Sequence, residues 1–540
     1  MLLKYWNTIK FLKVSQIFFR LFYYFYNPRI HKKDIPNKSE NFGLWNQAIK
    51  KNSSSNFIDN FRFINQSRTI KLPNDWQAHS FGKLWLYNLH YFDYLYSKDI
   101  TNEESTDLKI DLLIKWIEGN PIKEGVGWEQ YPTSLRIVNW IKWLNENSID
   151  NDFIDESLAI QTRYLIKKIE FHLSANHLLA NAKALIFSGL YFNNPESEKW
   201  LKRGIGLLSL ELKHQILNDG AHYERSPMYH SIIMEDILDI VQISRLQPNR
   251  IKDNLLDDLE ETFRKMFKWL MWMTHPDNSI AYFNDSSPNI APSLSELEEY
   301  ARILAVDCSR YELKDSIFLE SSGYAIANKN SAYLIIDMAK LGPDHQPGHG
   351  HADTLSFEMS LFNNRFIVNS GTSTYEDNEQ RNYERGTSSH NTVVINSKNS
   401  SEIWKSFRVA DRAIPSIINC ITDTDYFEVI ASHNGYRKIE GSPIHKRKWI
   451  LTRNRLVIED SISGRYDSAI AKFFFHPSIQ ITENLNFILP NGEICELKVS
   501  GGKPMLEDSN WSEGFNRLTP NKVIHINFKK NRLLTKFSWR

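Results

Sequence analysis

The stretch KRKWILTRNRLVIEDSI, residues 446–462, gives the clearest indication of the fold. Two runs rich in β-branched and aromatic residues flank Arg453–Asn454, so the stretch predicts two antiparallel strands joined by a tight turn. Similar short runs lie on both sides of it, at 331–339, 365–372, 391–397, 426–434 and 471–477. Because no helical pattern separates these runs, they predict an antiparallel sandwich or barrel rather than a parallel sheet.

The first 300 residues or so have a different pattern. Apolar residues recur there at three- and four-residue spacing, in Leu108–Trp116, Leu135–Leu144, Leu178–Leu190 and Ile232–Leu246, which predicts amphipathic helices. The change from helical to strand patterns falls near 305–320. We therefore expect a multidomain α and β protein: a helical extension over 1–75, a helical domain over 76–312 and a β domain over 313–540.

Composition excludes some functions and leaves others open. The chain has 540 residues with 65 basic and 64 acidic side chains, a net charge of +1, so no overall field favours nucleic acid as a partner. It contains neither a GxGxxG motif nor a P-loop for a nucleotide. The three cysteines, Cys308, Cys420 and Cys495, are far apart, which argues against a disulfide-built scaffold.

The N-terminal residues 1–29 are apolar and basic, but polar residues interrupt them before any run reaches the length of a membrane span. No small-residue cleavage site follows. We expect an amphipathic helix packed on the body rather than a signal peptide, and a helix on a membrane surface is the alternative. This favours a cytoplasmic or membrane-peripheral location over secretion.

The densest group of chemically active side chains is PDHQPGHGHADTLSF, residues 343–357. It contains His345, His349, His351 and Asp353, and if the last three share a strand, its period of two directs them to one face. Clustered imidazoles beside a carboxylate suit a metal site or acid–base chemistry, since histidine titrates near neutral pH. The alternative is a polar loop that happens to hold histidines.

The next stretch, NSGTSTYEDNEQRNYERGTSSHNTVVIN (369–396), holds Asn369, Tyr375, Arg381, Arg385 and His390. Two guanidinium groups are able to bind carboxylate or sulfate in bidentate fashion. Taken singly, each arginine is also compatible with a surface or ion-pairing role.

Two stretches of the helical half add further candidates. NHLLANAKAL begins with Asn176–His177 at the head of a helical pattern, where Asn176 is also a plausible N-cap. DGAHYERSPMYHSII holds Glu224, Tyr229 and His230 just before another helix. Its density of titratable groups favours a functional site over capping and packing.

Together these segments resemble the heparinase II/III and alginate-lyase superfamily, over roughly residues 80–460. The pieces that carry the resemblance occur in order: GWEQYPTSLR (127–136), NHLLANAKAL (176–185), DGAHYERSPMYH (219–230), FNDS (283–286), HGHADTLSFEMS (349–360) and the stretch from NSGTSTY to RGTSSHNTV (369–393). The resemblance implies an incomplete (α/α) toroid followed by an antiparallel β-sandwich, with a glycan in the cleft between them. It also implies a polysaccharide lyase that cleaves an acidic, uronate-containing chain by β-elimination.

The resemblance also implies residue roles. Asn176 and His177 resemble the pair that neutralises the uronate carboxylate, Tyr229 the acid, and His349 the catalytic histidine, while Tyr375 corresponds more loosely to a second tyrosine. The base stays open among Tyr229, His349 and Tyr375. We assign to substrate binding Trp128, Tyr131, Glu224, His230, Arg381 and Arg385.

A zinc site is implied at His351, Asn369 and His390, with a structural role. The family usually has Asp where Asn369 stands, and a neutral amide is a poorer zinc ligand than a carboxylate. The sequence therefore leaves both a zinc-bound and a zinc-free site open.

Two other functions stay open on the sequence alone. A glycoside hydrolase would need two opposed carboxylates, for which Glu129, Glu224, Asp285 and Asp353 are candidates. A non-catalytic glycan-binding or surface-polysaccharide assembly protein would keep the fold without the chemistry. The identity of the polysaccharide is not readable from the sequence.

Overall fold

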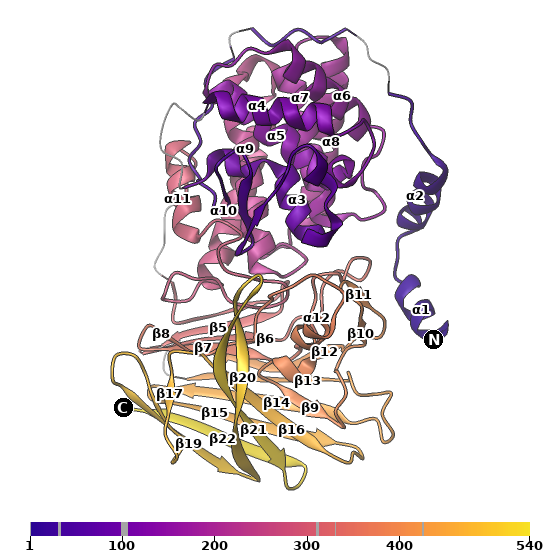
Figure 1. The fold of residues 1–540 in the computed structure, drawn as a ribbon. Helices are drawn as coiled ribbons and strands as arrows, with labels where there is room; N and C mark the ends of the chain where they lie inside the picture. Colours follow the sequence, from indigo (N-terminus) through magenta and orange to yellow (C-terminus); the bar gives the residue numbers. More distant parts are fainter. Residues whose placement is uncertain are drawn as a thin grey trace.

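The computed structural model describes residues 2–30, 34–40, 42–98, 106–308, 313–329, 331–423 and 426–540. Helices occupy the first part of the chain and large sheets the second, and the helical part lies on top of the β part in Figure 1. The predicted order of a helical part followed by a β part is confirmed.

The helices of the first part are α1 (Leu2–Ile9), α2 (Val14–Phe25), α3 (Lys83–Tyr91), α4 (Thr106–Gly119), α5 (Gln130–Glu146), α6 (Asp152–Leu165), α7 (Ala175–Tyr191), α8 (Pro195–Gln215), α9 (Pro227–Leu246), α10 (Asp253–Trp272) and α11 (Leu294–Ile303). The four segments predicted from apolar spacing lie inside α4, α5, α7 and α9. Helix α7 packs against α5, α8 and α9. Aromatic rings fill the core of the helical part; for example, Trp116 of α4 and Trp140 of α5 meet edge to face at 5.4 Å.

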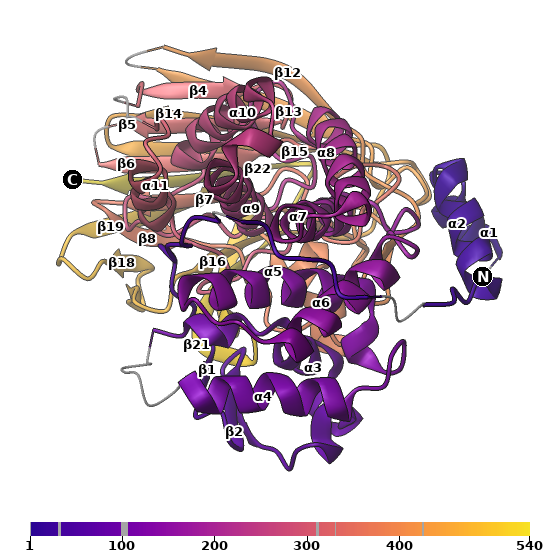
Figure 2. The same ribbon diagram turned by 90° about the horizontal axis from the view of Figure 1, so that it is seen from above.

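Residues 1–75 are not wholly helical, which corrects the expected helical extension. After α1 and α2, a small antiparallel sheet is formed by β1 (Ser54–Ser55), β2 (Asn60–Phe63) and β3 (Gln66–Thr69), and Figure 2 shows β1 and β2 beside α3 and α4. In β2 exposed and buried residues alternate, and Phe61 and Phe63 are buried in the helical core. Ile64 and Asn65 form the turn with positive φ values of 46° and 61°, as a tight hairpin requires.

The β part contains two large antiparallel sheets, with one short helix, α12 (Glu379–Glu384), between strands. One sheet has the order β12-β13-β14-β15-β22-β19-β18-β17, and the other β20-β21-β16-β8-β7-β6-β5-β4, with β9 paired to β16. A small hairpin of β10 and β11 stands apart. The strands are β4 (Ser316–Leu319), β5 (Tyr324–Lys329), β6 (Ala332–Asp337), β7 (Phe357–Leu361), β8 (Asn364–Ile367), β9 (Val393–Ile395), β10 (Ile403–Trp404), β11 (Arg408–Val409), β12 (Pro415–Thr422), β13 (Phe427–His433), β14 (Ile444–Thr452), β15 (Arg455–Ser463), β16 (Ala469–Phe475), β17 (Gln480–Ile481), β18 (Asn486–Ile488), β19 (Ile494–Ser500), β20 (Gly502–Gly514), β21 (Arg517–Phe528) and β22 (Arg532–Trp539).

The hairpin predicted at 446–462 is confirmed as β14 and β15, which pair from Ile444↔Ser463 to Thr452↔Arg455 around the turn Arg453–Asn454. The other five predicted strand runs overlap β6, β8, β9, β13 and β16. Inward-facing side chains of the two sheets, among them Trp449 and Phe473, form one buried core. This makes the β part a sandwich.

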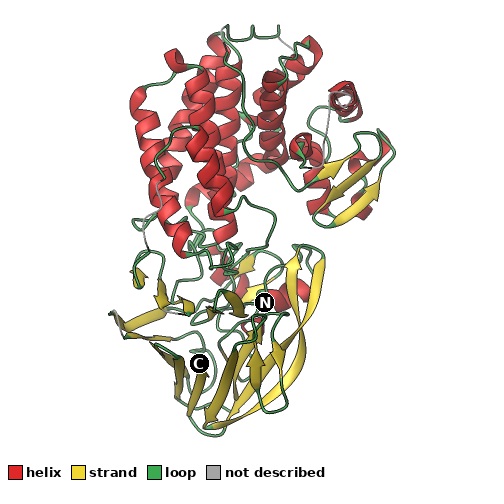
Figure 3. Ribbon diagram, turned by 90° about the vertical axis from the view of Figure 1, so that its left-hand side faces the viewer, coloured by secondary structure: helices red, strands yellow, loops and turns green. Residues whose placement is uncertain are grey.

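The helical and β parts meet through a buried apolar cluster that joins the end of α10 to β5 and β6. Trp269 donates its indole N–H to Ser322 Oγ at 3.1 Å, and Tyr333 donates its hydroxyl to Trp272 O at 2.8 Å. Figure 3 shows the helical bundle standing on this end of the sheets. Among the described residues, no helix has the length and apolar character needed to cross a bilayer.

Candidate active site

A cleft of about 580 Å³ lies between the helical and β parts. Tyr131 of α5, Lys183 of α7 and Tyr229 of α9 line it from the helical side, and Tyr375 and Phe515 line it from the β side. Aromatic surfaces and charged groups from both parts therefore face one cavity, as a glycan-binding cleft requires.

Tyr229 is positioned by the start of α9. Ser226 caps this helix by accepting a hydrogen bond from the Tyr229 backbone N–H at 3.2 Å, and Pro227 takes the first helical position. The Tyr229 ring packs on the His349 ring with centroids 4.0 Å apart and a tilt of 34°. Its hydroxyl lies 3.1 Å from the Tyr375 hydroxyl. The structure thus brings three of the predicted catalytic residues into contact.

His349 lies in a loop, because β7 begins only at Phe357. The condition that His349, His351 and Asp353 share a strand is therefore not met, and a different feature brings the two histidines together. His349 Nδ1 lies 2.8 Å from Asp285 Oδ2, and His351 Nε2 lies 2.9 Å from Asp285 Oδ1. Both histidines converge on one carboxylate.

Asp285 is completely buried, and Arg381 donates to both of its oxygens. Burial acts to raise the pKa of Asp285, but the Arg381 charge and the hydrogen bonds outweigh it and hold this pKa well below its ordinary value. A carboxylate that is always ionised must receive hydrogen bonds, so His349 Nδ1 carries a proton. The lone pair of the neutral ring is then on Nε2, and burial lowers the pKa of His349 below its ordinary 6.5.

The two tyrosines of the cleft stay protonated. Burial raises the pKa of Tyr229 well above its ordinary value of 10, and their contact and the Asp285 charge add to this. Burial likewise raises the pKa of Tyr375 well above 10. Near neutral pH both are phenols, which donate protons and do not accept them from carbon.

Asn176 is the second residue of α7, and Ser174 is the N-cap, so Asn176 itself is not the cap. Ser174 and Ala175 enter the helix with φ values of 68° and 54°, a strained conformation for residues with side chains. Asn176 Oδ1 is buried and receives no hydrogen bond from the described residues. The fold therefore leaves this amide oxygen without a donor among the described residues, and Nδ2 is the atom able to donate to a carboxylate.

His177 lies beside Asn176 and is better exposed. Its Nδ1 lies 3.0 Å from Glu170 Oε1, and its ring lies 4.6 Å from that of Tyr131, which lines the cleft. The hydrogen bond to Glu170 leaves His177 Nε2 for a ligand.

Several residues assigned to substrate binding are instead buried in the protein. Trp128 is 3% exposed and donates to Asn120 O. His230 is fully buried, with Nδ1 accepting from the His222 N–H and Nε2 bonded to Met266 O. Of the six substrate-binding assignments, only Tyr131 lines the cleft.

The two arginines are buried for a physical reason. Arg381 neutralises Asp285, and Arg385 donates to Gly350 O and Lys405 O. Both guanidiniums thus brace the loops that carry the histidines, and neither is a free clamp for an anion. Glu224 is 2% exposed, and burial raises its pKa to about 8, so it is mainly protonated at neutral pH.

The three residues implied as zinc ligands come close to one another. His390 Nδ1 lies 3.2 Å from Asn369 Oδ1, and the rings of His351 and His390 lie 5.3 Å apart. His351 Nδ1 and His390 Nε2 are buried without a hydrogen-bond partner among the described residues. These two imidazole nitrogens are therefore available as metal ligands. However, no group of three or more His, Cys, Asp or Glu side chains in the described part of the chain is arranged to hold a metal ion.

Acidic residues also line the cleft, but they are engaged. The ion pairs join Lys51 to Glu235, Lys142 to Asp239, and Lys183 to both Asp236 and Asp239. Of the candidates for a hydrolase pair, Asp285 is bound to Arg381, while Glu224 and Asp353 are buried. The geometry gives little support to two free, opposed carboxylates.

Asp285 is the important residue to which the sequence analysis gave no role in the lyase site. In the sequence, Asp285 is a candidate only for the carboxylate pair of a hydrolase, and it belongs to the motif FNDS (283–286). Its partners lie 64, 66 and 96 positions away, so no local pattern pointed to them. Phe515 and Arg517, which line the cleft from the far C-terminal strands, carried no signal either.

Comparisons with known proteins agree with this arrangement. Residues 90–310 match the family model described as "Heparinase II/III N-terminus", and residues 312–540 match "Heparinase II/III-like, C-terminal". Together the two models cover most of the chain.

Curated relatives and a solved structure are also similar. A heparin-sulfate lyase of Bacteroides thetaiotaomicron is 26% identical over 54% of this chain and 48% of its own length. One from Bacteroides stercoris is 24% identical over 72% of this chain and 60% of its own. The chain thus spans about half the length of these relatives. The crystal structure of heparinase III covers 85% of this chain and 76% of its own at 19% identity, with a TM-score of 0.67, and supports the predicted fold of a toroid followed by a sandwich.

Proposed function

The chain belongs to the heparinase II/III family, and we propose that it is a polysaccharide lyase that cleaves a uronate-containing polysaccharide by β-elimination. The observation that carries the proposal is the contact of a protonated phenol, Tyr229, with a neutral imidazole, His349, at a cleft between the two parts. The similarity to heparin-sulfate lyases supports an acidic polysaccharide as substrate.

His349 is the base in this proposal. The sequence left Tyr229, His349 and Tyr375 open, but the raised pKa of both phenols disfavours the phenolate that a tyrosine base needs. His349 is neutral near pH 7, and Asp285 holds Nδ1 as the donor, so Nε2 presents its lone pair. His349 Nε2 takes the C5 proton of the uronate.

Tyr229 is the acid. As the C5–H electrons form the C4–C5 double bond, the C4–O4 bond breaks and O4 takes the proton of the Tyr229 hydroxyl. The Tyr375 hydroxyl, 3.1 Å away, stabilises the phenolate that remains. The proton held on His349 then returns to Tyr229 directly or through water, which restores both groups.

Asn176 and His177 bind the uronate carboxylate. Charge moves onto this carboxylate as C5 loses its proton, and donors already fixed there stabilise the enolate without reorganising. The amide NH₂ of Asn176 is suited to this role, and so is His177 Nε2 when the ring carries a proton on both nitrogens, because Glu170 engages Nδ1. One such donor typically contributes about 3–4 kcal/mol to the transition state.

The contact between the two rings also favours one class of uronate. Because the Tyr229 and His349 rings pack on each other with centroids 4.0 Å apart, we infer that the acid and the base approach the sugar from the same side. In D-glucuronate and D-mannuronate, the C5 hydrogen and O4 lie on the same face of the ring, whereas in L-iduronate and L-guluronate they lie on opposite faces. A substrate with the glucuronate or mannuronate configuration is therefore preferred.

A zinc ion, if bound, is held by His351 and His390 with Asn369, and it stabilises the cleft wall. Burial lowers the pKa of His351 to about 4 and that of His390 well below 6.5, so both rings are neutral, as zinc requires. The amide of Asn369 brings no charge to offset that of the ion, so we propose weak binding.

The test is an assay of unsaturated end groups by their ultraviolet absorbance, on acidic polysaccharides of each uronate configuration. Wild-type protein should produce the absorbance, and Tyr229→Phe should lower kcat about 10²–10⁴-fold. Tyr426→Phe, at a surface position where the hydroxyl donates to Glu428, should keep wild-type turnover. New reducing ends without ultraviolet absorbance would instead identify a hydrolase.

Retained binding without turnover in the wild type would support the remaining alternative, a non-catalytic glycan-binding protein. Titration of the wild type and of Tyr229→Phe with the polysaccharide answers this question, because the two proteins would then bind it equally and neither would produce absorbance. If the wild type turns the substrate over and Tyr229→Phe does not, that alternative is excluded.

A further inference from the structure

The two N-terminal helices expose an unusual number of large apolar side chains. Six of these residues, here called the outer face, are Trp6, Val14, Phe18, Leu21, Tyr24 and Phe25, with exposed fractions of 64%, 83%, 57%, 61%, 84% and 81%. Scattered exposed apolar residues are normal, but a contiguous set of this kind marks an interaction surface.

The outer face follows the helical repeat. Val14, Phe18, Leu21 and Phe25 are spaced by four, three and four residues, which puts them on one side of α2. In an ordinary surface helix this apolar stripe would face the core. Here it faces away from the protein.

The opposite side of the two helices is fixed to both parts of the molecule. In α2, Gln16 is buried and donates to His345 O at 3.2 Å, and Tyr23 donates to Ile169 O at 2.7 Å. In α1, Tyr5 packs edge to face on Trp404 at 5.1 Å. These contacts fix the orientation of both helices. The outer face is therefore the side that does not pack on the protein.

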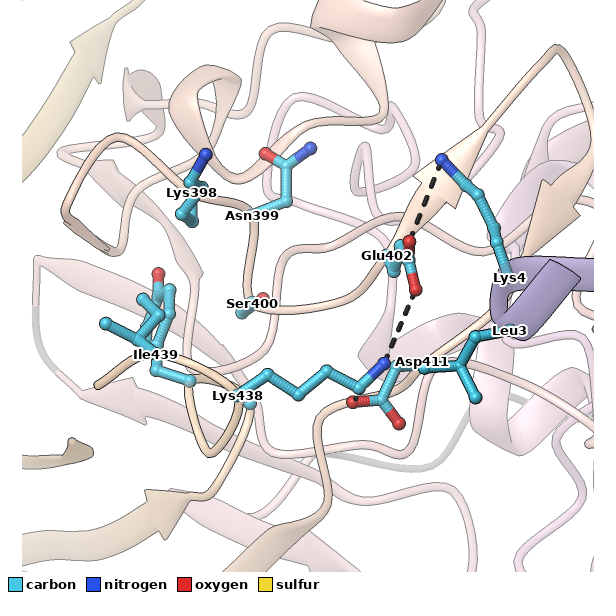
Figure 4. Close-up of a pocket in the computed structure, with 11 residues that line it drawn as sticks. Leu3, Lys4, Lys398, Asn399, Ser400, Glu402, Asp411, Lys438 and Ile439 are labelled. Carbon is cyan, nitrogen blue, oxygen red and sulfur yellow. Dashed lines mark hydrogen bonds and ion pairs between the residues drawn. The ribbon is translucent and has the colours of Figure 1, made fainter. Parts of the chain in front are cut away.

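Figure 4 shows how α1 sits on the β part. The Lys4 ammonium forms an ion pair with Glu402 at 3.8 Å, and Lys438 reaches the same carboxylate from the other side at 3.5 Å. A cavity of about 470 Å³ lies between α1 and these loops. Both helices lie along one edge of the molecule (Figures 1 and 2).

The charge of this segment identifies the partner. Residues 1–33 contain seven Lys and Arg residues and no Asp or Glu. Lys10, Lys13 and Arg29 among them are exposed. A second copy of the chain would bring the same positive charges together across a two-fold interface, whereas an anionic bilayer offers both an apolar interior and negative head groups.

We propose that α1 and α2 bind the surface of an anionic lipid bilayer. The helices lie in the interface: α2 has 12 residues and a length of about 18 Å, less than the ~30 Å hydrocarbon core. The outer face enters the boundary between head groups and acyl chains, and the lysines contact the lipid phosphates.

The experiment is flotation of the full chain with vesicles made of equal parts phosphatidylglycerol and phosphatidylcholine, or of phosphatidylcholine alone. The wild type should float with the anionic vesicles and much less with the neutral ones. The variant Phe18→Ser/Leu21→Ser/Phe25→Ser should lower the bound fraction at least about tenfold, because three apolar side chains no longer leave water. Lys10→Glu/Lys13→Glu should also weaken binding, most clearly at low salt.

The matched control replaces three other exposed apolar residues, Leu210→Ser/Ile418→Ser/Ile494→Ser, whose exposed fractions are 50%, 53% and 49%. It should float like the wild type. Equal flotation of the wild type and the α2 variant overturns the proposal. So does a wild-type dimer, measured by sedimentation without lipid, that the α2 variant loses, since the outer face would then join two copies. Turnover of a short soluble substrate should be the same in all these proteins, which separates this proposal from the lyase activity.

Discussion

Replacing Asp285 by Asn tests whether the fixed tautomer of His349 makes it the base. Asp285 accepts hydrogen bonds from His349, His351 and Arg381 and donates none. Asn keeps the shape but replaces one oxygen by an NH₂ group. The amide oxygen stays at the Oδ1 position, which receives His351, Arg381 and Thr372. The NH₂ group therefore takes the Oδ2 position beside His349, and Nδ1 must accept. The proton then moves to Nε2, where the base needs a lone pair.

The size of the effect follows from these roles. A general base contributes about 10²–10⁴-fold, so kcat should fall by about this factor while KM changes little. Arg381 also loses its buried ionic partner, which costs about 3 kcal/mol in the free energy of unfolding, the low end for a broken buried pair because Asn still accepts one bond. At about 2–4 °C per kcal/mol, the melting temperature should fall by roughly 6–12 °C.

The β part provides a matched control for the loss of stability. Asp460 accepts from His445 at 2.7 Å and from Arg447 at 2.7 and 3.1 Å, and all three residues are fully buried in the sandwich. Asp460→Asn should lower the melting temperature by a similar amount and leave kcat unchanged. Both variants are assayed well below their melting temperatures. A kcat for Asp285→Asn within about threefold of that for Asp460→Asn would refute the tautomer argument.

Three further predictions concern the same site. Asn176→Ala should lower kcat about 10²–10³-fold on a polysaccharide substrate, because the enolate loses one fixed donor; an unchanged kcat would remove Asn176 from the mechanism. The pH profile of kcat/KM should fall on the acid side only below pH 6.5, as His349 with its lowered pKa gains a proton, and should show no alkaline loss below about pH 10, because the pKa of Tyr229 is raised; an alkaline loss near pH 8 would contradict this. Asn369→Asp should raise the zinc content of the purified protein, measured by elemental analysis, to one ion per chain, whereas the wild type should lose its zinc to a mild chelator without losing activity; equal zinc content in both would contradict the ligand set.

The fold was largely predictable because its signals are local. Apolar spacing identified α4, α5, α7 and α9, since each buries one face against its neighbours. The hairpin of β14 and β15 was predicted with its turn. The segment before residue 75 was predicted wrongly as helical, because β1, β2 and β3 have only two to four residues each and such runs are too short for a period of two to be recognised.

The candidate site residues were predicted from the sequence, but their arrangement was predicted only in part. Tyr229, His349 and Tyr375 were found from motifs, and the structure brings them into contact. The sequence does not show whether a side chain is exposed. Arg381 and Arg385 were expected to bind an anion, but each is fully buried and binds protein groups. An arginine-rich loop gives the same sequence pattern whether its guanidiniums face a ligand or brace the loop itself.

The two buried His–Asp–Arg groups show where the limit of sequence reasoning lies. His445, Arg447 and Asp460 belong to one hairpin, and its register puts Arg447 directly opposite Asp460, with His445 two residues along on the same face. The sequence contains that group once the turn is identified. The group around Asp285 is assembled from a loop 64 residues away and from helix α12, 96 residues away. This group, unlike the other, lies beside a tyrosine and an open cleft. The same three residue types thus stabilise the sandwich in one place and, in the proposed mechanism, fix the tautomer of the base in the other. The difference lies in long-range contacts, because only these bring Tyr229, His349 and the cleft together.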